Sequence, residues 1–379
     1  MAESPPLPTG RPRTLAEAKQ WMHDKLAARA HPLSLLDPRE AAPLIDSLKG
    51  LDGDSWVDVW GKAGDRTAEL ARAAEVRGDA TLAAGLYMRA HGYYFFGRFP
   101  CPNHPRKLEC ARRERETYLD AARYFKIGIE RVEVPFSGRP GEGTVIPILV
   151  RRPVNVAKPP VVVMWGGVDA WKEQMTEVSN ALLAAGVATI AMDNAGTGES
   201  PVVGSFDAER QFLPVFDWIA AQADLSGAKV GCLGRSFGGY WATKLAHLHP
   251  ERIAGAVSWG GGAHHMFQKD WVEASRYPDS YLMELVETRS RMLGASSDAE
   301  YIEFFQKLSL VDLGLLDRPC APLLLVNGKF DKQCPVEDIF LLLDHGSPKS
   351  VRLFPGGHMG HTPRTVPTIV EWLVEQVRA

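Results

Sequence analysis

The sequence lacks several features that would assign it to a special class of protein. It holds five cysteines, an odd number without the spacing of a disulfide framework, so we expect reduced thiols and a cytoplasmic protein. Its longest apolar run, residues 181–192, contains a glycine and is too short to cross a bilayer. Residues 1–6 show no basic stretch followed by an apolar one, so we expect no secretory signal. The 43 basic and 46 acidic residues nearly balance, which argues against nucleic acid or a membrane as a partner.

The pattern of apolar residues changes along the 379-residue chain and indicates several regions. Residues 1–13 are rich in proline and predict a flexible arm. A helical periodicity runs through residues 14–128, which we interpret as an N-terminal helical domain. Over residues 129–379, apolar strands alternate with helical stretches, which indicates an α/β core with a mostly parallel, doubly wound sheet. The alternation is interrupted at about 262–317, where we expect a helical cap insertion over the ligand-binding edge of the sheet.

Residues 234–238 read Gly-Arg-Ser-Phe-Gly and stand between a predicted strand, 229–233, and a predicted helix, 240–247. This context is typical of a nucleophile elbow, in which the glycines allow a sharp turn from strand to helix. Such a turn holds the serine in a strained conformation with its hydroxyl above the sheet. We therefore predict that Ser236 is a catalytic nucleophile and that the N–H group of Phe237 faces the developing oxyanion.

A serine hydroxyl needs a base, and the base needs an acid that orients it. Two later segments supply candidates: Asp331 follows one predicted strand, and His358 follows the next. Both stand at strand ends on the same sheet edge as Ser236, so we predict them as acid and base. His361 is the alternative base. The two histidines together would suit a metal, but no glutamate or cysteine stands at ligand spacing, so we expect no metal and no cofactor.

Stabilisation of an oxyanion needs a second N–H group, usually from the loop after an early strand. Residues 166–168, Gly-Gly-Val, follow the predicted strand at 161–165 and meet this requirement, because glycine lets the backbone approach a substrate closely. We predict Val168 or Gly167 as this donor. Residues 193–200 match neither a dinucleotide-binding motif nor a P-loop, and we interpret them as a structural turn beside the site.

The predicted insertion and the strand before it contain aromatic and polar residues that would suit substrate contacts. The candidates are Trp259, His264, His265, Trp271 and Glu273. Aromatic residues in such segments more often belong to the core, so packing is the alternative interpretation of the two tryptophans.

A family resemblance is carried by four segments: residues 165–167 with 172–173, residues 193–200, residues 234–239 and residues 258–261. They resemble the α/β-hydrolase group that contains the FrsA-like esterases, 2,6-dihydroxypseudooxynicotine hydrolase and the fungal Yg1-type polyketide-shortening hydrolases. The resemblance extends over roughly residues 60–379 and implies an α/β-hydrolase fold preceded by a helical region.

The same resemblance implies roles for individual residues. Ser236, Asp331 and His358 match the catalytic triad of the group, and Val168 and Phe237 match its oxyanion donors. The resemblance also implies a homodimer, with a substrate cavity between the core and the helical region.

These observations predict a serine hydrolase that cleaves a small-molecule carbonyl substrate through an acyl-enzyme. We favour a carboxylic ester with an aromatic or hydrophobic moiety, because ester cleavage is the commoner activity on this fold. The alternative is hydrolysis of a carbon–carbon bond in an aryl ketone, β-diketone or polyketide, for which the same triad would serve. A more distant alternative is a non-catalytic binding protein, but such proteins usually lose a triad residue, and all three are present here.

Overall fold

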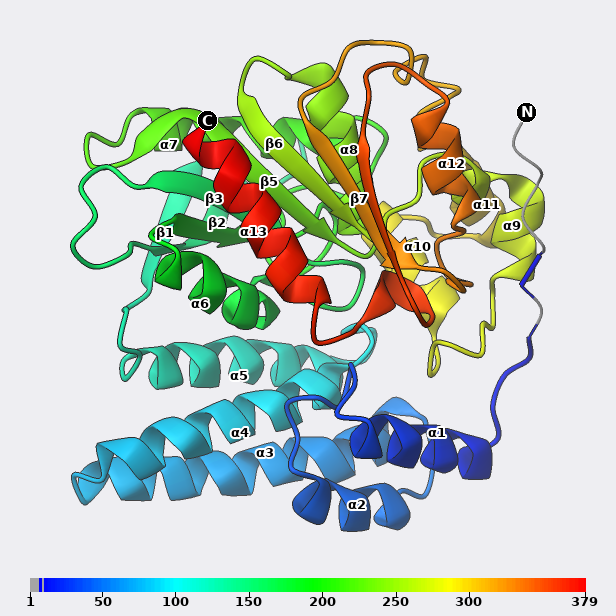
Figure 1. Ribbon diagram of the computed structural model, residues 1–379. Helices are drawn as coiled ribbons and strands as arrows, with labels where there is room; N and C mark the ends of the chain where they lie inside the picture. The colour runs from blue at the N-terminus through cyan, green and yellow to red at the C-terminus, as the bar shows by residue number, and fades with distance from the viewer. Residues whose placement is uncertain (1–6, 9) are drawn as a thin grey trace. The chain divides into compact units, whose positions relative to one another are not determined.

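The computed structural model describes residues 7, 8 and 10–379 (Figure 1). Part of the predicted flexible arm, residues 1–6 and 9, lies outside the described residues. The chain divides into two units. Most of the core unit is formed by Glu130–Ser280 and Arg289–Ala379, and the helical unit consists of Arg11–Ile129 and Tyr281–Thr288.

Most of the helical unit is built from α1 (Leu15–Ala27), α2 (Pro38–Ser47), α3 (Gly53–Val76), α4 (Ala80–Arg98) and α5 (Pro105–Ala122). The helices α3 and α4 are separated where Gly78 adopts a φ of 77°, a conformation that suits glycine, and where Asp79 caps α4 by accepting from the N–H of Leu82 at 3.0 Å. Among the helices that the structure describes, none combines the length and apolar character needed to cross a bilayer.

Aromatic side chains form the core of the helical unit. The ring of Phe96 packs edge-on against Trp60 and Trp56, with centroids 4.7 and 4.9 Å away. Tyr281 and Leu285, from a distant part of the chain, are buried in the same cluster. Residues 281–288 fall within the predicted insertion at 262–317, yet they pack in the helical unit.

The core unit contains one mixed sheet of eight strands in the order β1-β2-β4-β3-β5-β6-β7-β8. β1 pairs antiparallel with β2, β2 pairs antiparallel with β4, and the remaining neighbours are parallel. The strands are β1 (Glu130–Pro135), β2 (Val145–Arg151), β3 (Pro160–Trp165), β4 (Ala188–Met192), β5 (Ser226–Arg235), β6 (Ile253–Trp259), β7 (Leu323–Gly328) and β8 (Ser350–Phe354). The predicted, mostly parallel sheet is thus present, and the carboxyl ends of β3 to β8 lie at one edge.

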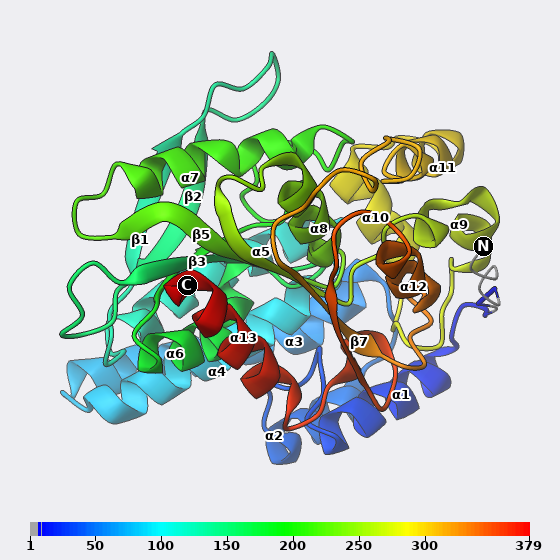
Figure 2. The same ribbon diagram turned by 45° about the horizontal axis from the view of Figure 1, so that its top comes forward.

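Helices cover both faces of this sheet, with α6 and α13 on one face and α7 and α8 on the other (Figure 2). The helices of the core unit are η1 (Lys172–Met175), α6 (Thr176–Ala184), η2 (Ala208–Gln211), α7 (Leu213–Ala220), α8 (Gly238–Leu248), η3 (His265–Phe267), α9 (Lys269–Ala274), α11 (Asp298–Gln306), α12 (Glu337–Leu343), η4 (His358–Gly360) and α13 (Thr365–Arg378), with the end of α10 (Leu285–Leu293). α13 packs directly on the strands because Gly231 and Gly255 lack side chains; a Cβ there would lie 2.8 Å from Val377 and 2.7 Å from Gln376.

Candidate functional site

Ser236 lies at a sharp turn between β5 and α8, as the sequence predicts. Its φ is 54°, a left-handed conformation that costs energy for a residue other than glycine. Two glycines make the turn possible: a Cβ on Gly234 would collide with the carbonyl group of Gly238, and a Cβ on Gly238 would collide with that of Gly166. The N–H of Ser236 donates to the carbonyl of Trp259 at 2.7 Å, which ties the turn to β6. The serine hydroxyl is therefore presented at the carboxyl edge of the sheet.

His358 follows β8, and its ring reaches the serine. The distance between His358 Nε2 and Ser236 Oγ is 2.7 Å. The loop that carries the ring is held at Met359, whose N–H donates to the side chain of Asn327 at 3.0 Å and whose carbonyl accepts from Trp259 Nε1 at 2.7 Å. These bonds fix the ring, and its 16% exposure leaves it accessible to a substrate. The ring of the alternative base, His361, instead lies against Trp259, with centroids 5.2 Å apart.

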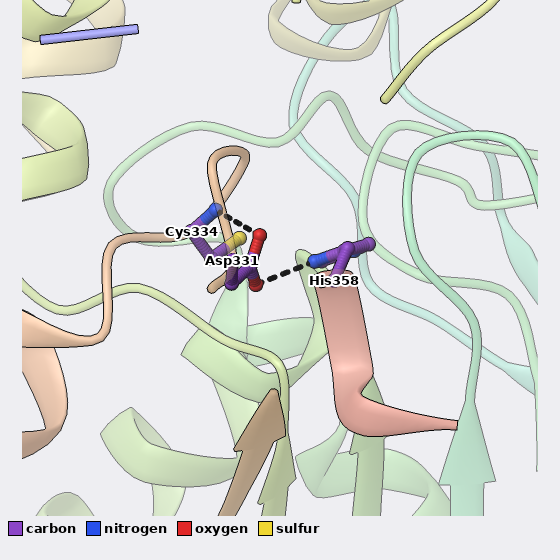
Figure 3. Close-up of side chains that lie close together, drawn as sticks. All are labelled: Asp331, Cys334 and His358. Atoms are coloured by element: carbon purple, nitrogen blue, oxygen red, sulfur yellow. Dashed lines mark hydrogen bonds and ion pairs between the residues drawn. The ribbon is translucent and has the colours of Figure 1, made fainter. Parts of the chain in front are cut away.

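Asp331 follows β7 and extends this chain of hydrogen bonds (Figure 3). Its Oδ2 lies 2.7 Å from His358 Nδ1. Its Oδ1 accepts the backbone N–H groups of Gln333 and Cys334 at 2.7 and 3.2 Å, and the carboxylate is fully buried. An N–H group on Nδ1 that donates to Asp331 leaves Nε2 to accept the proton of Ser236. The three predicted residues are thus brought together from three strand ends.

Asp331, Cys334 and His358 also place three possible metal ligands within 4.8 Å of one another (Figure 3). The chemistry of these donors does not suit a metal. Burial raises the pKa of the Cys334 thiol well above its ordinary value, and the charge of Asp331 raises it further, whereas a metal ligand must be a thiolate. Both nitrogens of His358 are already engaged, one by Ser236 and the other by Asp331.

The loop after β3 contacts the serine directly. A Cβ on Gly167 would lie 2.7 Å from Ser236 Cβ and 3.1 Å from its Oγ, so only glycine fits there without displacing the nucleophile. Among the residues that the structure describes, neither Val168 nor Phe237 donates its N–H to a backbone carbonyl. No described backbone carbonyl therefore competes with a ligand for these two N–H groups, which agrees with the prediction of an oxyanion hole.

An ionic network that the sequence analysis missed supports this loop. Lys172 is buried in η1, and its Nζ lies 2.7 Å from Asp193, 2.7 Å from Glu199 and 3.3 Å from Glu173. The backbone N–H of Lys172 also donates to Asp193 at 2.9 Å. Burial by itself lowers the pKa of Lys172, but the three carboxylates outweigh it and raise the pKa above its ordinary value. The predicted turn at 193–200 thus supplies two counter-ions to the loop after β3.

The segment after β6 is anchored by another residue that the sequence did not single out. The buried carboxylate of Asp338 accepts the backbone N–H groups of Ala263, His264 and His265 at 2.9, 3.0 and 2.7 Å. The ring of His264 is bonded to Ser309 at 2.7 Å, and burial lowers its pKa. A single acid that follows a proline-containing turn gives no local signal, because its partners lie about 75 residues away.

The remaining predicted contact residues differ in their surroundings. Trp259 is buried beside the triad, where its ring lies 5.9 Å from the guanidinium of Arg235, the residue before the nucleophile. Trp271 is also buried, in α9. The side chain of Glu273 is 46% exposed and lies 3.9 Å from Lys269 on the same helix. Of these residues, only Trp259 is joined to the triad by described hydrogen bonds: its carbonyl accepts the N–H of Ser236 at 2.7 Å, and its Nε1 donates to Met359, the residue after His358.

Comparisons with known proteins extend over most of the chain. The model of the family described as "Esterase FrsA-like" matches residues 34–378. The chain is 30% identical over 211 residues to 2,6-dihydropseudooxynicotine hydrolase of Paenarthrobacter nicotinovorans, and the match covers 55% of each protein, so the chain spans about half the length of that relative. It is 25% identical to esterase FrsA of Pectobacterium atrosepticum, over 81% of this chain and 72% of the relative.

Solved structures show the same fold. AbyA5 superposes with a TM-score of 0.76 over 97% of this chain and 95% of its own, at 23% identity. The crystal structure of 2,6-dihydroxy-pseudo-oxynicotine hydrolase superposes with a TM-score of 0.73 over 88% and 92%, also at 23% identity. These likenesses confirm the predicted α/β-hydrolase fold with its N-terminal helical region.

Proposed function

The chain belongs to the FrsA-like esterase family of α/β-hydrolases, and from this premise we propose that it cleaves a carboxylic ester by way of a Ser236 acyl-enzyme. The observation that carries the proposal is the continuous chain of hydrogen bonds from Ser236 through His358 to Asp331, with two distances of 2.7 Å. A serine hydrogen-bonded to a histidine, which is in turn hydrogen-bonded to a buried acid, is the arrangement that activates a hydroxyl near neutral pH.

The reaction follows from these contacts. His358 Nε2 takes the proton of Ser236 as Oγ attacks the carbonyl carbon, and Asp331 stabilises the imidazolium that forms. The oxygen of the tetrahedral intermediate accepts the N–H groups of Phe237 and Val168. His358 then gives its proton to the departing alkoxide, which leaves an acyl group on the serine. Water, deprotonated by His358, releases the acid and restores the hydroxyl.

The second candidate is hydrolysis of a carbon–carbon bond by the same residues. It is favoured by the relative at 30% identity, which is named for the hydrolysis of 2,6-dihydropseudooxynicotine and not as an esterase. In this reaction Ser236 attacks a ketone, and His358 protonates the departing carbanion. The carbanion must be stabilised as an enolate or an electron-rich ring, so the two reactions differ in what the pocket does for the leaving group.

Two substrate panels distinguish the candidates. One panel contains p-nitrophenyl esters of graded chain length, and the other contains aryl ketones and β-diketones, with products identified by mass spectrometry. The proposal predicts ester turnover that is lost in Ser236→Ala; ketone cleavage with only slow ester turnover would favour the second candidate. Fluorophosphonate should label the wild type and not Ser236→Ala. Folded wild-type protein that is not labelled would indicate a non-catalytic binding protein.

Two further expectations belong to this proposal. Activity that does not change in EDTA would agree with the poor suitability of Cys334 and His358 as metal ligands, and loss of activity would point to a metallohydrolase. The homodimer implied by the family resemblance is tested by light scattering on the purified chain.

A further inference from the structure

Arg289, in α10, is a buried cation without a carboxylate partner among the residues that the structure describes. The residue as a whole is only 2% exposed to solvent. Its Nη1 donates to Ser275 Oγ at 3.2 Å, whereas Nε is buried and has no hydrogen-bond partner in the described chain. A guanidinium offers five donors and stays charged at every pH at which proteins are folded. Burying such a charge without a counter-ion is costly, so the position indicates a ligand that supplies one.

Two more buried donors lie on the helices that contact Arg289. Trp271 and Ser275 are four residues apart at α9, and Tyr301 and Phe305 are four apart in α11, so each pair shares a helix face. Arg289 contacts both faces, through Ser275 and through the ring of Phe305 at 5.1 Å. Trp271 Nε1 and the Tyr301 hydroxyl are buried and, like Arg289 Nε, find no acceptor among the described residues. Each of the three helices α9, α10 and α11 therefore contributes one buried donor that has no acceptor in the described part of the chain.

This group of donors is connected to the triad from two sides. The ring of Phe305 lies 6.0 Å from that of Phe237, which directly follows the nucleophile. On the other side is Cys334, whose backbone N–H donates to Asp331. Burial and the charge of Asp331 raise the pKa of the Cys334 thiol, and the positive charge of Arg289 opposes them, so Arg289 is near enough to interact electrostatically with this thiol.

We propose that Arg289, Tyr301 and Trp271 form a subsite that binds an anionic oxygen group of the substrate, either a carboxylate or the enolate of a β-dicarbonyl compound. This inference rests on the proposed hydrolase function, because it assigns the substrate class of that site. An anionic oxygen accepts two parallel N–H bonds from a guanidinium, and the hydroxyl and indole donors satisfy its remaining lone pairs. The rings of Phe305 and Phe267, 5.3 Å apart, offer an apolar wall to the body of the substrate.

A matched pair of esters tests the subsite in the full-length chain. Mono-p-nitrophenyl glutarate carries a free carboxylate, and p-nitrophenyl valerate is a neutral ester of similar length. We expect the wild type to prefer the glutarate, and Arg289→Met to lower kcat/KM about 10- to 100-fold for the glutarate and less than about threefold for the valerate. Tyr301→Phe should lower the glutarate value by a smaller factor. Arg291→Met changes an exposed arginine of the same helix and should leave both values unchanged.

Binding measurements distinguish the two kinds of anion, a carboxylate and an enolate. Isothermal titration of Ser236→Ala with glutarate, and separately with the acidic cyclic β-diketone dimedone, shows whether a carboxylate or an enolate is bound; in each case Arg289→Met should weaken the binding. Equal losses for both esters in Arg289→Met, or no preference in the wild type, would show that Arg289 is a structural cation and would overturn the inference. If Arg289→Met does not fold, Arg289→Lys and Tyr301→Phe serve in its place.

Failure of the subsite can be told apart from failure of the proposed function. If fluorophosphonate labels Ser236 and neutral esters are cleaved, but neither anion binds, only the subsite is wrong. If no ester is cleaved and no label is incorporated, yet glutarate or dimedone binds through Arg289, only the hydrolase proposal is wrong.

Discussion

Two groups of buried polar side chains in the core unit differ in whether the cation at their centre has carboxylate partners. Around Lys172, beside β3 and β4, three carboxylates surround one cation, with the shortest distances at 2.7 Å. Arg289, in α10, contacts the ring of Phe305 and donates to the hydroxyl of Ser275, but no carboxylate among the described residues pairs with it. The cation of Lys172 is matched by carboxylates of the protein itself, whereas the Arg289 group needs an acceptor from outside the protein.

This difference separates polar residues that hold a fold from those that bind a ligand. A buried charge with partners stabilises the arrangement of the segments that carry it, and removing one partner leaves the others uncompensated. A buried donor without an acceptor has a cost in the free protein, and a ligand that accepts from it recovers that cost. Burial alone would have placed Lys172 and Arg289 in the same class, because both are at most 2% exposed.

The largest expected effect is on catalysis, at the buried acid of the triad. In Asp331→Asn the amide favours the wrong tautomer of His358, so we expect kcat/KM for p-nitrophenyl esters to fall about 10³- to 10⁴-fold. Asp317 is the matched control, because it makes the same kind of contact with His345 at 2.8 Å but is 87% exposed. Asp317→Asn should keep full activity. Equal activity of Asp331→Asn and the wild type would show that His358 does not depend on this acid.

The next effect is on stability, and it tests whether the network around Lys172 depends on its cation. In Lys172→Met the buried carboxylates of Asp193 and Glu173 lose their cation, whereas the partly exposed Glu199 keeps Arg131 at 3.1 Å. We therefore expect the free energy of unfolding to fall by about 3–5 kcal/mol. Urea denaturation followed by circular dichroism measures it. Lys269 is exposed and lies 3.9 Å from its single partner, so Lys269→Met should cost less than about 0.5 kcal/mol. A cost below about 1 kcal/mol for Lys172→Met would mean that the network does not depend on its cation.

A smaller effect is expected where the loop after β3 meets the nucleophile. In Gly167→Ala the new Cβ lies 2.7 Å from Ser236 Cβ, so the loop must shift and its N–H groups leave the oxyanion position. We expect kcat to fall about 10- to 100-fold, the loss that follows when an oxyanion donor is weakened. Gly85→Ala is the control: no atom lies within 4 Å of the added Cβ in α4, and it should raise stability by up to about 1 kcal/mol without changing kcat. A Gly167→Ala variant with wild-type kcat would argue against this loop as the second donor.

The smallest effect depends on pH and concerns His247, in α8. Its Nδ1 is bonded to the carbonyl of Thr243 at 2.9 Å, its Nε2 is buried without a partner in the described chain, and burial lowers its pKa below the ordinary value of about 6.5. The unfolded chain therefore binds a proton more readily than the folded one below this pH. The contribution of neutral His247 to the free energy of unfolding is complete above about pH 6.5. It is lost as the pH falls below this value, by at most about 1.4 kcal/mol per pH unit.

The measurement for His247 is the free energy of unfolding from pH 8 to pH 5 in the wild type and in His247→Gln. Glutamine can still donate to the carbonyl of Thr243 but does not titrate, so the loss of stability toward acid pH should be smaller in the variant. Identical slopes in the two proteins would show that His247 does not contribute.

Local sequence determined the parts of this protein that depend on neighbouring residues. The elements around Ser236 are contiguous in the sequence: a strand precedes it, a helix follows it, and glycines stand between them. The steric requirements of this turn are therefore visible in the local sequence. The order of acid and histidine after Ser236 identified Asp331 and His358, which the structure brings to 2.7 Å from each other. Conformational preferences also indicated the helical N-terminal region and the alternating strands of the sheet.

Only the tertiary structure decided what depends on burial and on distant partners. Residues 281–288 read as part of the insertion but pack with the helical unit. Lys172 and Arg289 look alike in sequence, because neither has a local pattern that tells whether carboxylates will surround it. The energy of a buried charge is set by groups that the fold brings from far along the chain, such as Asp193 to Lys172 and Ser275 to Arg289. Which cation is matched, and which awaits a ligand, is therefore a property of the folded chain.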